Sequence, residues 1–193
     1  MSTFSDIFHQ QLAAHRTAAE RLPEILPELE RLSGAIIDCL NAGRKVLFFG
    51  NGGSAADAQH LAAEFVIRYR INRRSLPSLA LTTDTSMLTA CGNDFGFETV
   101  FARQIEGLAN AGDVAIGITT SGNSANVLAG LVAAKEKGCV TVCFTAESGG
   151  KAAALSDIAI KAPSPITAHA QECHMIIGHI LCEMVDRAFA DPV

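Results

Sequence analysis

The sequence is poor in basic residues and has no cluster of them. It contains 15 Lys and Arg against 20 Asp and Glu, a net charge of −5, and its longest basic stretch is NRR at 72–74. Nucleic-acid-binding proteins normally carry a basic patch or stripe. The composition therefore argues against a nucleic-acid partner, and any anionic ligand must be held by local groups.

Closely spaced cysteine pairs and long apolar runs are also missing. None of the six cysteines belongs to a CxxC pair, and most lie in apolar stretches such as GCVTVCF, so we interpret them as buried thiols in a reducing compartment. No segment reaches the roughly 18 uninterrupted apolar residues of a membrane-spanning helix, and the N-terminus has no leader pattern. We therefore expect a cytoplasmic protein without a membrane partner.

What the sequence has is a regular alternation of apolar runs and helical stretches. With 193 residues, 49% of them hydrophobic, the chain can build one sizeable core. Short, fully apolar strands that alternate with helices are typical of a parallel sheet covered on both faces. We predict an α/β fold with a doubly wound five-stranded parallel sheet flanked by helices. The five strand-like runs are KVLFF at 45–49, SLALTT at 78–83, DVAIGIT at 113–119, CVTVCF at 139–144 and DIAIKA at 157–162.

Helical segments precede and follow this alternation. Residues 1–43 are predicted to form an N-terminal helical arm, with a break between two helices at Pro23 and Pro27. Residues 44–193 then form a single structural unit whose last helix is 167–190. The apolar positions of that helix go well around its circumference, and burial against another subunit would account for this.

Two loops at predicted strand ends have the composition of a ligand site. In GNGGS at 50–54, glycines allow backbone N–H groups to approach a ligand, and Ser54 is predicted to cap the next helix. In TTSGNSANV at 119–127, Thr119, Thr120, Ser121 and Ser124 surround Gly122. A phosphate monoester would fit there because helix N-termini favour anions. An ordinary Ser/Thr-rich turn is the alternative. Neither loop is a nucleotide-binding G-x-G-x-x-G or P-loop motif.

Five segments resemble the SIS (sugar isomerase) domains of the phosphoheptose isomerase type, and the resemblance covers nearly the entire chain. It implies conversion of sedoheptulose 7-phosphate to D-glycero-D-manno-heptose 7-phosphate, the first step toward activated heptose for lipopolysaccharide core or other surface glycans. It also implies a homotetramer with active sites shared between adjacent subunits, and one zinc ion per site. In chain order the segments are GNGGSAADAQHLAAEF, LTTDTS, GNDFGFE, TTSGNSANV and QECHMIIGHILCEMVD.

Four side chains are candidates for the metal. His60 and Glu64 are four residues apart on one helical face, and Gln171 and His179, eight apart, lie on one side of the last helix. Two nitrogen or oxygen ligands from each helix could close a four-coordinate zinc site. An amide oxygen is a weak ligand, however, so Gln171 could bind substrate instead, and His60 and Glu64 alone would be ordinary surface residues.

Aldose–ketose isomerisation requires a proton to move between C1 and C2 through an enediol. We assign Glu64 and His179 as the acid/base pair, with the two roles left open. The resemblance assigns contacts with the sugar to Asn51, Gly52, Gly53, Asn93 and Asp94, besides Glu64, Gln171 and the four hydroxyls.

The other histidines have no such pattern. His174 is interpreted as a core or interface residue, and His9, His15 and His169 as surface residues. Two departures from the family stand out: Thr119 replaces a serine, and SPITAHAQE at 164–172 lacks the charged residue that many relatives carry before the glutamine. The second leaves the contacts to the middle hydroxyls of the sugar, and hence the substrate, open.

Two other functions remain open from the sequence. Some SIS proteins of this size form tetramers that bind a bacterial replication initiator without catalysis; the presence of His179 in the full set argues against this. An isomerase of pentose phosphates would be expected to carry further C-terminal domains.

Overall fold

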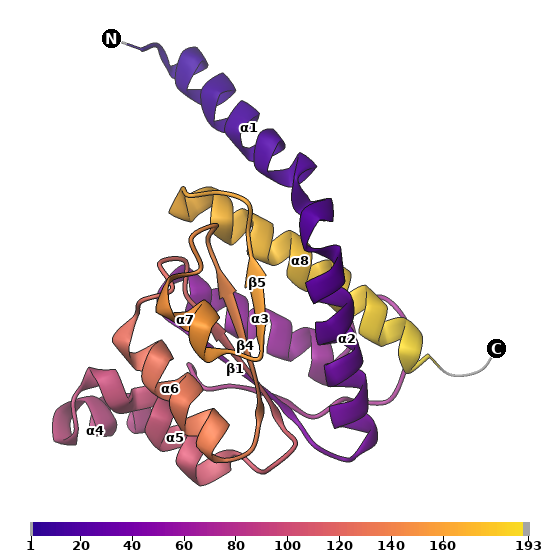
Figure 1. Ribbon diagram of the computed structural model, residues 1–193, viewed down its shortest axis with the longest axis vertical. Coiled ribbons are helices and arrows are strands. Elements are labelled where there is room, and N and C mark those ends of the chain that lie inside the picture. The colour runs from indigo at the N-terminus through magenta and orange to yellow at the C-terminus, as the bar shows by residue number, and fades with distance from the viewer. Residues whose placement is uncertain (1, 191–193) are drawn as a thin grey trace.

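The computed structural model describes residues 2–190. Its centre is a five-stranded sheet of order β2-β1-β3-β4-β5 with every pairing parallel, which confirms the predicted fold (Figure 1). The predicted unit boundary at 43/44 stays a prediction, and residues 1 and 191–193 of the two predicted segments lie outside the described residues. The strands are β1 (Val46–Gly50), β2 (Ser78–Ala80), β3 (Val114–Ile118), β4 (Val140–Thr145) and β5 (Ile158–Lys161).

Helices cover both faces of the sheet. The α-helices are α1 (Phe4–Glu20), α2 (Leu26–Asn41), α3 (Gly53–Val66), α4 (Thr85–Asp94), α5 (Val100–Leu108), α6 (Ala125–Glu136), α7 (Gly150–Leu155) and α8 (Thr167–Ala188). Two short 3₁₀ helices are η1 (Leu22–Ile25) and η2 (Phe97–Thr99).

The alternation of side chains along β1 separates two cores. Val46 and Phe48 point into a core shared with α2, α3 and α8, whereas Leu47 and Phe49 point into a core shared with α5 and α6. All five residues of β1 are buried. A strand that is apolar at every position is therefore explained by a helix layer on each face.

The two predicted N-terminal helices are present, and η1 occupies the break at Pro23. α1 projects away from the sheet (Figure 1), whereas α2 packs into the core through Leu32 and Ile36. α8 buries ten residues in its own chain, where it is covered by α2, α3 and α1. Its wide apolar circumference is thus accounted for without a second subunit.

The strand order determines where a ligand site can form. In a 2-1-3-4-5 sheet the chain leaves β1 and β3 in opposite directions, so a crevice opens between the loops that follow these strands. Those loops are the glycine loop 51–53 and the hydroxyl loop 119–124 singled out in the sequence. The topology therefore brings the two predicted ligand loops together.

The prediction that Ser54 caps the following helix is wrong. α3 begins two residues earlier than a cap at Ser54 would place it, with Gly52 at the N-cap position and no side-chain cap. Gly52 has a φ of 55°, a conformation that glycine adopts without strain. Ser54 is 4% exposed and lies beside Gly50, so it packs in the first turn instead of capping it.

All six cysteines are free thiols, and five of them are buried. Burial raises the pKa of Cys39 and Cys139 to about 11 and that of Cys182 to about 12, so these thiols remain protonated near neutral pH. Among the described residues, no helix has the length and apolarity needed to span a membrane.

Candidate active site

A pair of amide side chains ties the two ligand loops together. Asn51 donates from Nδ2 to Asn126 Oδ1, and Asn126 donates back to Asn51 Oδ1, both at 2.8 Å. Asn126 is 4% exposed and lies in the first turn of α6. The glycine loop and the hydroxyl loop are thereby held in a fixed relation across the crevice.

The hydroxyl loop is organised around Thr119. This residue is 3% exposed, and its Oγ1 lies 3.0 Å from Ser124 Oγ and 3.4 Å from Ser121 Oγ. Ser124 is the N-cap residue of α6, yet its side chain makes no capping bond. Gly122 has a φ of 65°, which lets the chain turn tightly between the hydroxyls. The first N–H groups of an α-helix have no acceptor within the helix, and helix N-termini favour anions, so the start of α6 is compatible with the predicted phosphate site.

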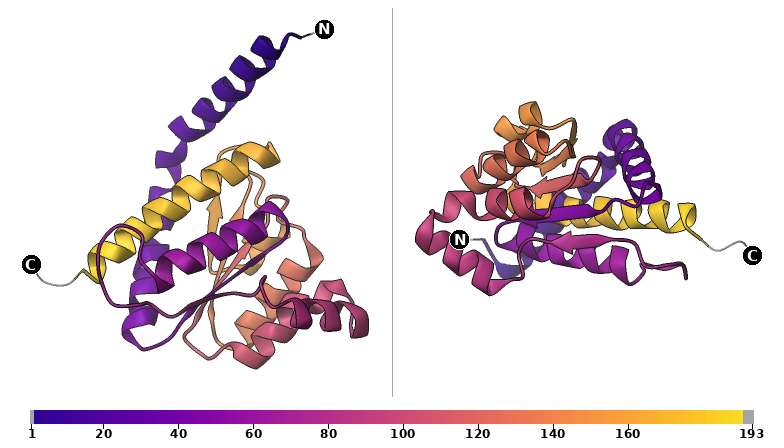
Figure 2. Two further views of the ribbon diagram at one scale, coloured as in Figure 1. Left: turned by 180° about the vertical axis from the view of Figure 1, so that it is seen from behind. Right: turned by 90° about the horizontal axis from the view of Figure 1, so that it is seen from below.

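Helices α3 and α8 lie side by side and run parallel (Figure 2). A Cβ atom on Gly53 would lie 2.7 Å from Gln171 Nε2, and one on Gly178 would lie 2.6 Å from Leu61 Cδ2. Both glycines thus leave room where the two helices approach closely, since a larger residue would displace the side chain of Gln171 or Leu61. Gln171 is thus placed against the glycine loop, as a substrate-binding residue would be.

Further along the same two helices, three of the predicted residues lie close together: His60, Glu64 and His179. We call them the α3–α8 cluster. His60 Nε2 lies 3.0 Å from His179 Nε2 and 3.5 Å from Glu64 Oε1. His60 occupies the middle, and its neighbours flank it on either side. The ring of Tyr69 stacks on His179 with centroids 5.2 Å apart and an interplanar angle of 16°, which fixes the orientation of that imidazole.

In the α3–α8 cluster, His60 lies at a zinc-like spacing from two of the other predicted ligands. Zinc bonds of about 2.0–2.2 Å place two ligands of a tetrahedron roughly 3.3 Å apart, close to the 3.0 and 3.5 Å measured from His60, but the ligand atoms of His60, Glu64 and His179 do not all lie within 4.8 Å of one another. The fourth, Gln171, is eight residues from His179, or about 12 Å along the helix axis at 1.5 Å per residue. Its side chain lies against Gly53. A cation held by His60, Glu64 and His179 would therefore require a side-chain adjustment, and the zinc site stays a prediction.

Asp57 occupies α3 one turn before His60 and was not singled out in the sequence. Its Oδ2 is buried without a hydrogen-bond partner. Burial raises the pKa of this carboxyl to about 6, and the nearby His60 opposes the shift. An unpaired carboxylate beside the cluster adds negative charge where a cation would be bound.

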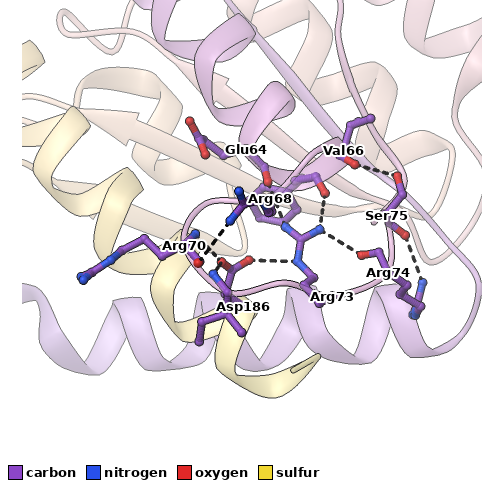
Figure 3. A network of polar contacts seen from close by, with 10 residues as sticks. Glu64, Val66, Arg68, Arg70, Arg73, Arg74, Ser75 and Asp186 are labelled. Atoms are coloured by element: carbon purple, nitrogen blue, oxygen red, sulfur yellow. Dashed lines mark hydrogen bonds and ion pairs between the residues drawn. The ribbon is translucent and has the colours of Figure 1, made fainter. Parts of the chain in front are cut away.

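A buried ion pair fixes the end of α3 that carries Glu64 (Figure 3). Arg73 donates from Nε to Asp186 Oδ1 at 2.9 Å, with both side chains 1% exposed, and its terminal nitrogens donate to the backbone carbonyls of Glu64 and Phe65. The backbone N–H of Arg70 donates to Asp186 as well. These hydrogen bonds satisfy the last carbonyls of α3 and attach them to α8.

Two predicted substrate residues lie apart from the rest. Asn93 and Asp94 are exposed at the end of α4 and bond to each other, Nδ2 to Oδ1 at 2.7 Å. α4 has no buried residue and lies on the side of the molecule away from α8 (Figures 1 and 2). Within one chain the structure does not bring these two residues to the α3–α8 cluster.

The predicted burial of the remaining histidines is only partly correct. His174 is a core residue as predicted: it is 1% exposed, donates to Thr145 O at 3.0 Å and has its pKa lowered by burial to about 4. His9 is exposed, as predicted. The prediction of a surface position is wrong for His169, which is 3% exposed, and His15 is half-buried. α1, which carries His15, packs over the start of α8 beside His169.

Sequence reasoning missed Asn126, Asp57 and Tyr69, whose roles depend on contacts between distant segments. Asn126 had the strongest signal, because it lies within the TTSGNSANV motif. Tyr69 lies five residues beyond Glu64 in a loop whose path no local pattern determines. Asp57 lies one helical turn from His60, which is the only hint of its position.

Comparisons with known proteins identify the family. The model of the SIS domain family matches residues 10–146. The chain is 54% identical over 188 residues to a phosphoheptose isomerase of Paramagnetospirillum magneticum, covering 97% of this chain and 98% of that protein. It is 57% identical over 155 residues to one of Aquifex aeolicus, covering 80% and 81%.

Solved structures agree with this assignment. The phosphoheptose isomerase of Neisseria gonorrhoeae superposes with a TM-score of 0.90 at 39% identity, and that of Francisella tularensis with 0.93 at 33% identity; each comparison covers 96% of this chain and 100% of the other. The structural comparison and the sequence comparison therefore indicate the same family, and both cover almost the full length of the chain. The chain belongs to the phosphoheptose isomerase family of SIS-domain enzymes.

Proposed function

We propose that this enzyme converts sedoheptulose 7-phosphate to D-glycero-D-manno-heptose 7-phosphate, the first step toward activated heptose for surface glycans. The observation that carries the proposal is the 54% identity to a phosphoheptose isomerase across 97% of this chain and 98% of that relative. The α3–α8 cluster beside a hydroxyl loop supplies groups suited to this chemistry.

Proton transfer is assigned to Glu64 and His179. One of them removes a proton from C1 of the ketose while the other protonates the carbonyl oxygen at C2, which gives the enediol. Return of a proton to C2 and loss of the proton on O1 then give the aldose, with no net change in protons. The two groups flank His60, so a substrate can be approached from two sides.

Binding of the sugar phosphate is assigned to the two loops. Thr120, Ser121 and Ser124, supported by the buried Thr119, would donate to the phosphate at the start of α6. Asn51, Gly52, Gly53 and Gln171 would bind sugar hydroxyls. The Asn51–Asn126 pair keeps these two parts of the site at a constant separation.

We assign one zinc ion per subunit to His60, Glu64 and His179, with Gln171 as a fourth ligand if its side chain leaves Gly53. When bound, zinc would polarise the carbonyl group of the substrate as a Lewis acid or brace the site. The two Nε2 atoms, 3.0 Å apart, are suited to it because either imidazole can present an unprotonated nitrogen.

The enzyme is proposed to be a cytoplasmic homotetramer with active sites completed by a neighbouring subunit. Exposed Phe4 and Phe8 on the projecting α1, at 94% and 62%, are unusual for a monomer surface. Asn93 and Asp94 are far from the cluster in their own chain, so a second subunit would have to supply them. Six free cysteines are consistent with a reducing compartment.

The proposal is tested by incubating purified protein with sedoheptulose 7-phosphate and following the products by NMR. We expect the aldose 7-phosphate to appear, and we expect no conversion of unphosphorylated sedoheptulose at the same concentration. Absence of conversion in the tetramer supplied with zinc would contradict the proposal and would favour the alternative, a non-catalytic SIS protein that binds a replication initiator.

A further inference from the structure

A second group of two histidines and one glutamate lies where α1 crosses α8. We call His15, His169 and Glu172 the α1–α8 cluster. Nδ1 of His15 lies 2.6 Å and Nδ1 of His169 lies 3.0 Å from the same oxygen, Glu172 Oε2. These three atoms all lie within 4.8 Å of one another. Among the described residues, no other group of three or more His, Cys, Asp or Glu side chains meets this condition.

The environment of the α1–α8 cluster combines a buried side with an open side. The side chain of His169 is 4% exposed, that of His15 is 31% exposed and that of Glu172 is 47% exposed. A groove of about 550 Å³ between α1 and α8 borders all three. A cation could therefore enter from the groove and retain water as a fourth ligand.

A simple hydrogen-bonded pin is the competing explanation, in which both imidazoles donate to one carboxylate oxygen. That arrangement leaves Nε2 of His169 unprotonated, buried and without a partner. The carboxylate oxygen can accept from both imidazoles, so the buried Nε2 of His169 is the atom that this arrangement leaves without a partner. Two imidazole nitrogens and a carboxylate oxygen are the donor set that zinc accepts readily.

We propose that the α1–α8 cluster is a second divalent-cation site, of the zinc class, that clamps the projecting helix α1 to the start of α8. It is separate from the α3–α8 cluster, because His169 and His179 are ten residues apart, or about 15 Å along the helix. His169 and Glu172 lie on either side of Gln171 in the sequence, so a cation bound there would also hold in place the turn of α8 that carries Gln171.

The buried Nε2 atom of His169 limits the affinity of the α1–α8 cluster for a cation. If Nδ1 binds the cation, the ring proton moves to Nε2, which has no acceptor. A metal-bound histidine without its outer hydrogen-bond partner typically binds the metal about 10–100-fold more weakly. The clamp should therefore release its ion before the α3–α8 cluster does when a chelator is added.

The test is equilibrium dialysis of chelator-treated, full-length protein against increasing free Zn²⁺, with metal analysis of each sample. We expect a zinc equivalent that is retained in the His60→Gln/His179→Gln double variant and is lost in both His15→Gln and Glu172→Gln. His9→Gln is the matched control, because His9 is an exposed histidine on the same helix, and it should retain that equivalent.

Trypsin cleavage after the exposed Arg16 gives a second readout. Zn²⁺ should slow this cleavage at least about threefold in the wild type and in His9→Gln, and it should have no effect in His15→Gln. A zinc content that does not respond to His15→Gln and Glu172→Gln would overturn the second site. Zinc that disappears only with His60 and His179 would do the same while leaving the active-site assignment intact.

Discussion

The α3–α8 cluster and the α1–α8 cluster contain the same residue types, two histidines and one glutamate, but in a different order in space. In the α1–α8 cluster the carboxylate is central, and both imidazoles point at one of its oxygens. In the α3–α8 cluster an imidazole is central, and Glu64 and His179 lie to either side of it. A central carboxylate is already satisfied, whereas outer acid and base groups remain available to a substrate. We infer that the arrangement, more than the composition, distinguishes the proposed clamp from the proposed catalytic cluster.

The clusters also differ in how the chain supports them. The α3–α8 cluster rests on the buried Arg73–Asp186 pair, whereas the α1–α8 cluster depends on its own three side chains. Asp186→Ala should lower the free energy of unfolding by about 3–5 kcal/mol, since it leaves the Arg73 charge buried without a partner. Urea titration measures this change.

The control for the buried pair is Arg187→Ala, which removes the exposed bond between Arg187 and Glu183 and should cost about 0–1 kcal/mol. Equal losses in the two variants would show that the buried network does not hold the end of α3.

Catalytic roles should be confined to one cluster. We expect Glu64→Gln and His179→Gln each to lower kcat by roughly 10²-fold or more, because each removes one proton-transfer group. Glu172→Gln should lower kcat by less than about tenfold, because Glu172 takes no part in the proposed proton transfer. Steady-state kinetics on the folded variants checks this contrast, and losses of similar size in all three variants would remove it.

The hydroxyl loop should affect substrate binding more than turnover. Ser121→Ala and Ser124→Ala should each raise KM for the sugar phosphate by about tenfold, because a charge-assisted hydrogen bond to phosphate is worth roughly 1.5–3 kcal/mol. Inorganic phosphate should compete with substrate in the wild type. An unchanged KM in both variants would reduce the loop to an ordinary turn.

Acidic groups beside the two clusters should respond to pH in opposite ways. Burial raises the pKa of Asp57 to about 6 from 3.8, so its folded form prefers the proton and stability falls as pH rises from about 4 through 6. The pKa of Glu172 is lowered, mainly by the hydrogen bond from His169, so its contribution is lost as pH falls.

Asp57→Asn should therefore stabilise the chelator-treated protein above pH 6 and not below pH 4. The full shift corresponds to about 3 kcal/mol, which partial exposure of the side chain reduces to about 1 kcal/mol. Thermal unfolding at pH 4 and pH 8 measures the difference, and stabilisation of equal size at both values would contradict the assignment.

Local sequence patterns predicted the strands and the loops that follow β1 and β3, because strand runs and turn residues are local properties. Helical spacing placed His60 and Glu64 on one face of α3, but grouping them with His179 depended on the family resemblance, because local spacing does not determine which helices pack together. Burial of His169 could not be predicted, since it depends on where α1 crosses α8. The misplaced cap at Ser54 has a similar origin: Gly52 allows α3 to start two residues earlier than a cap at Ser54 would. Gln171 was placed on the correct face of α8, but axial distance along the helix separates it from His179.

Solvent isotope incorporation tests the central claim, proton transfer by the α3–α8 cluster, most directly. The wild-type protein is incubated with sedoheptulose 7-phosphate in deuterium oxide until the two sugars reach equilibrium. We predict carbon-bound deuterium at C1 of the ketose and C2 of the aldose, and its absence over the same time with Glu64→Gln and His179→Gln. Aldose that forms at the wild-type rate without any carbon-bound deuterium would show that the hydrogen moves without an exchangeable base, and would contradict the account.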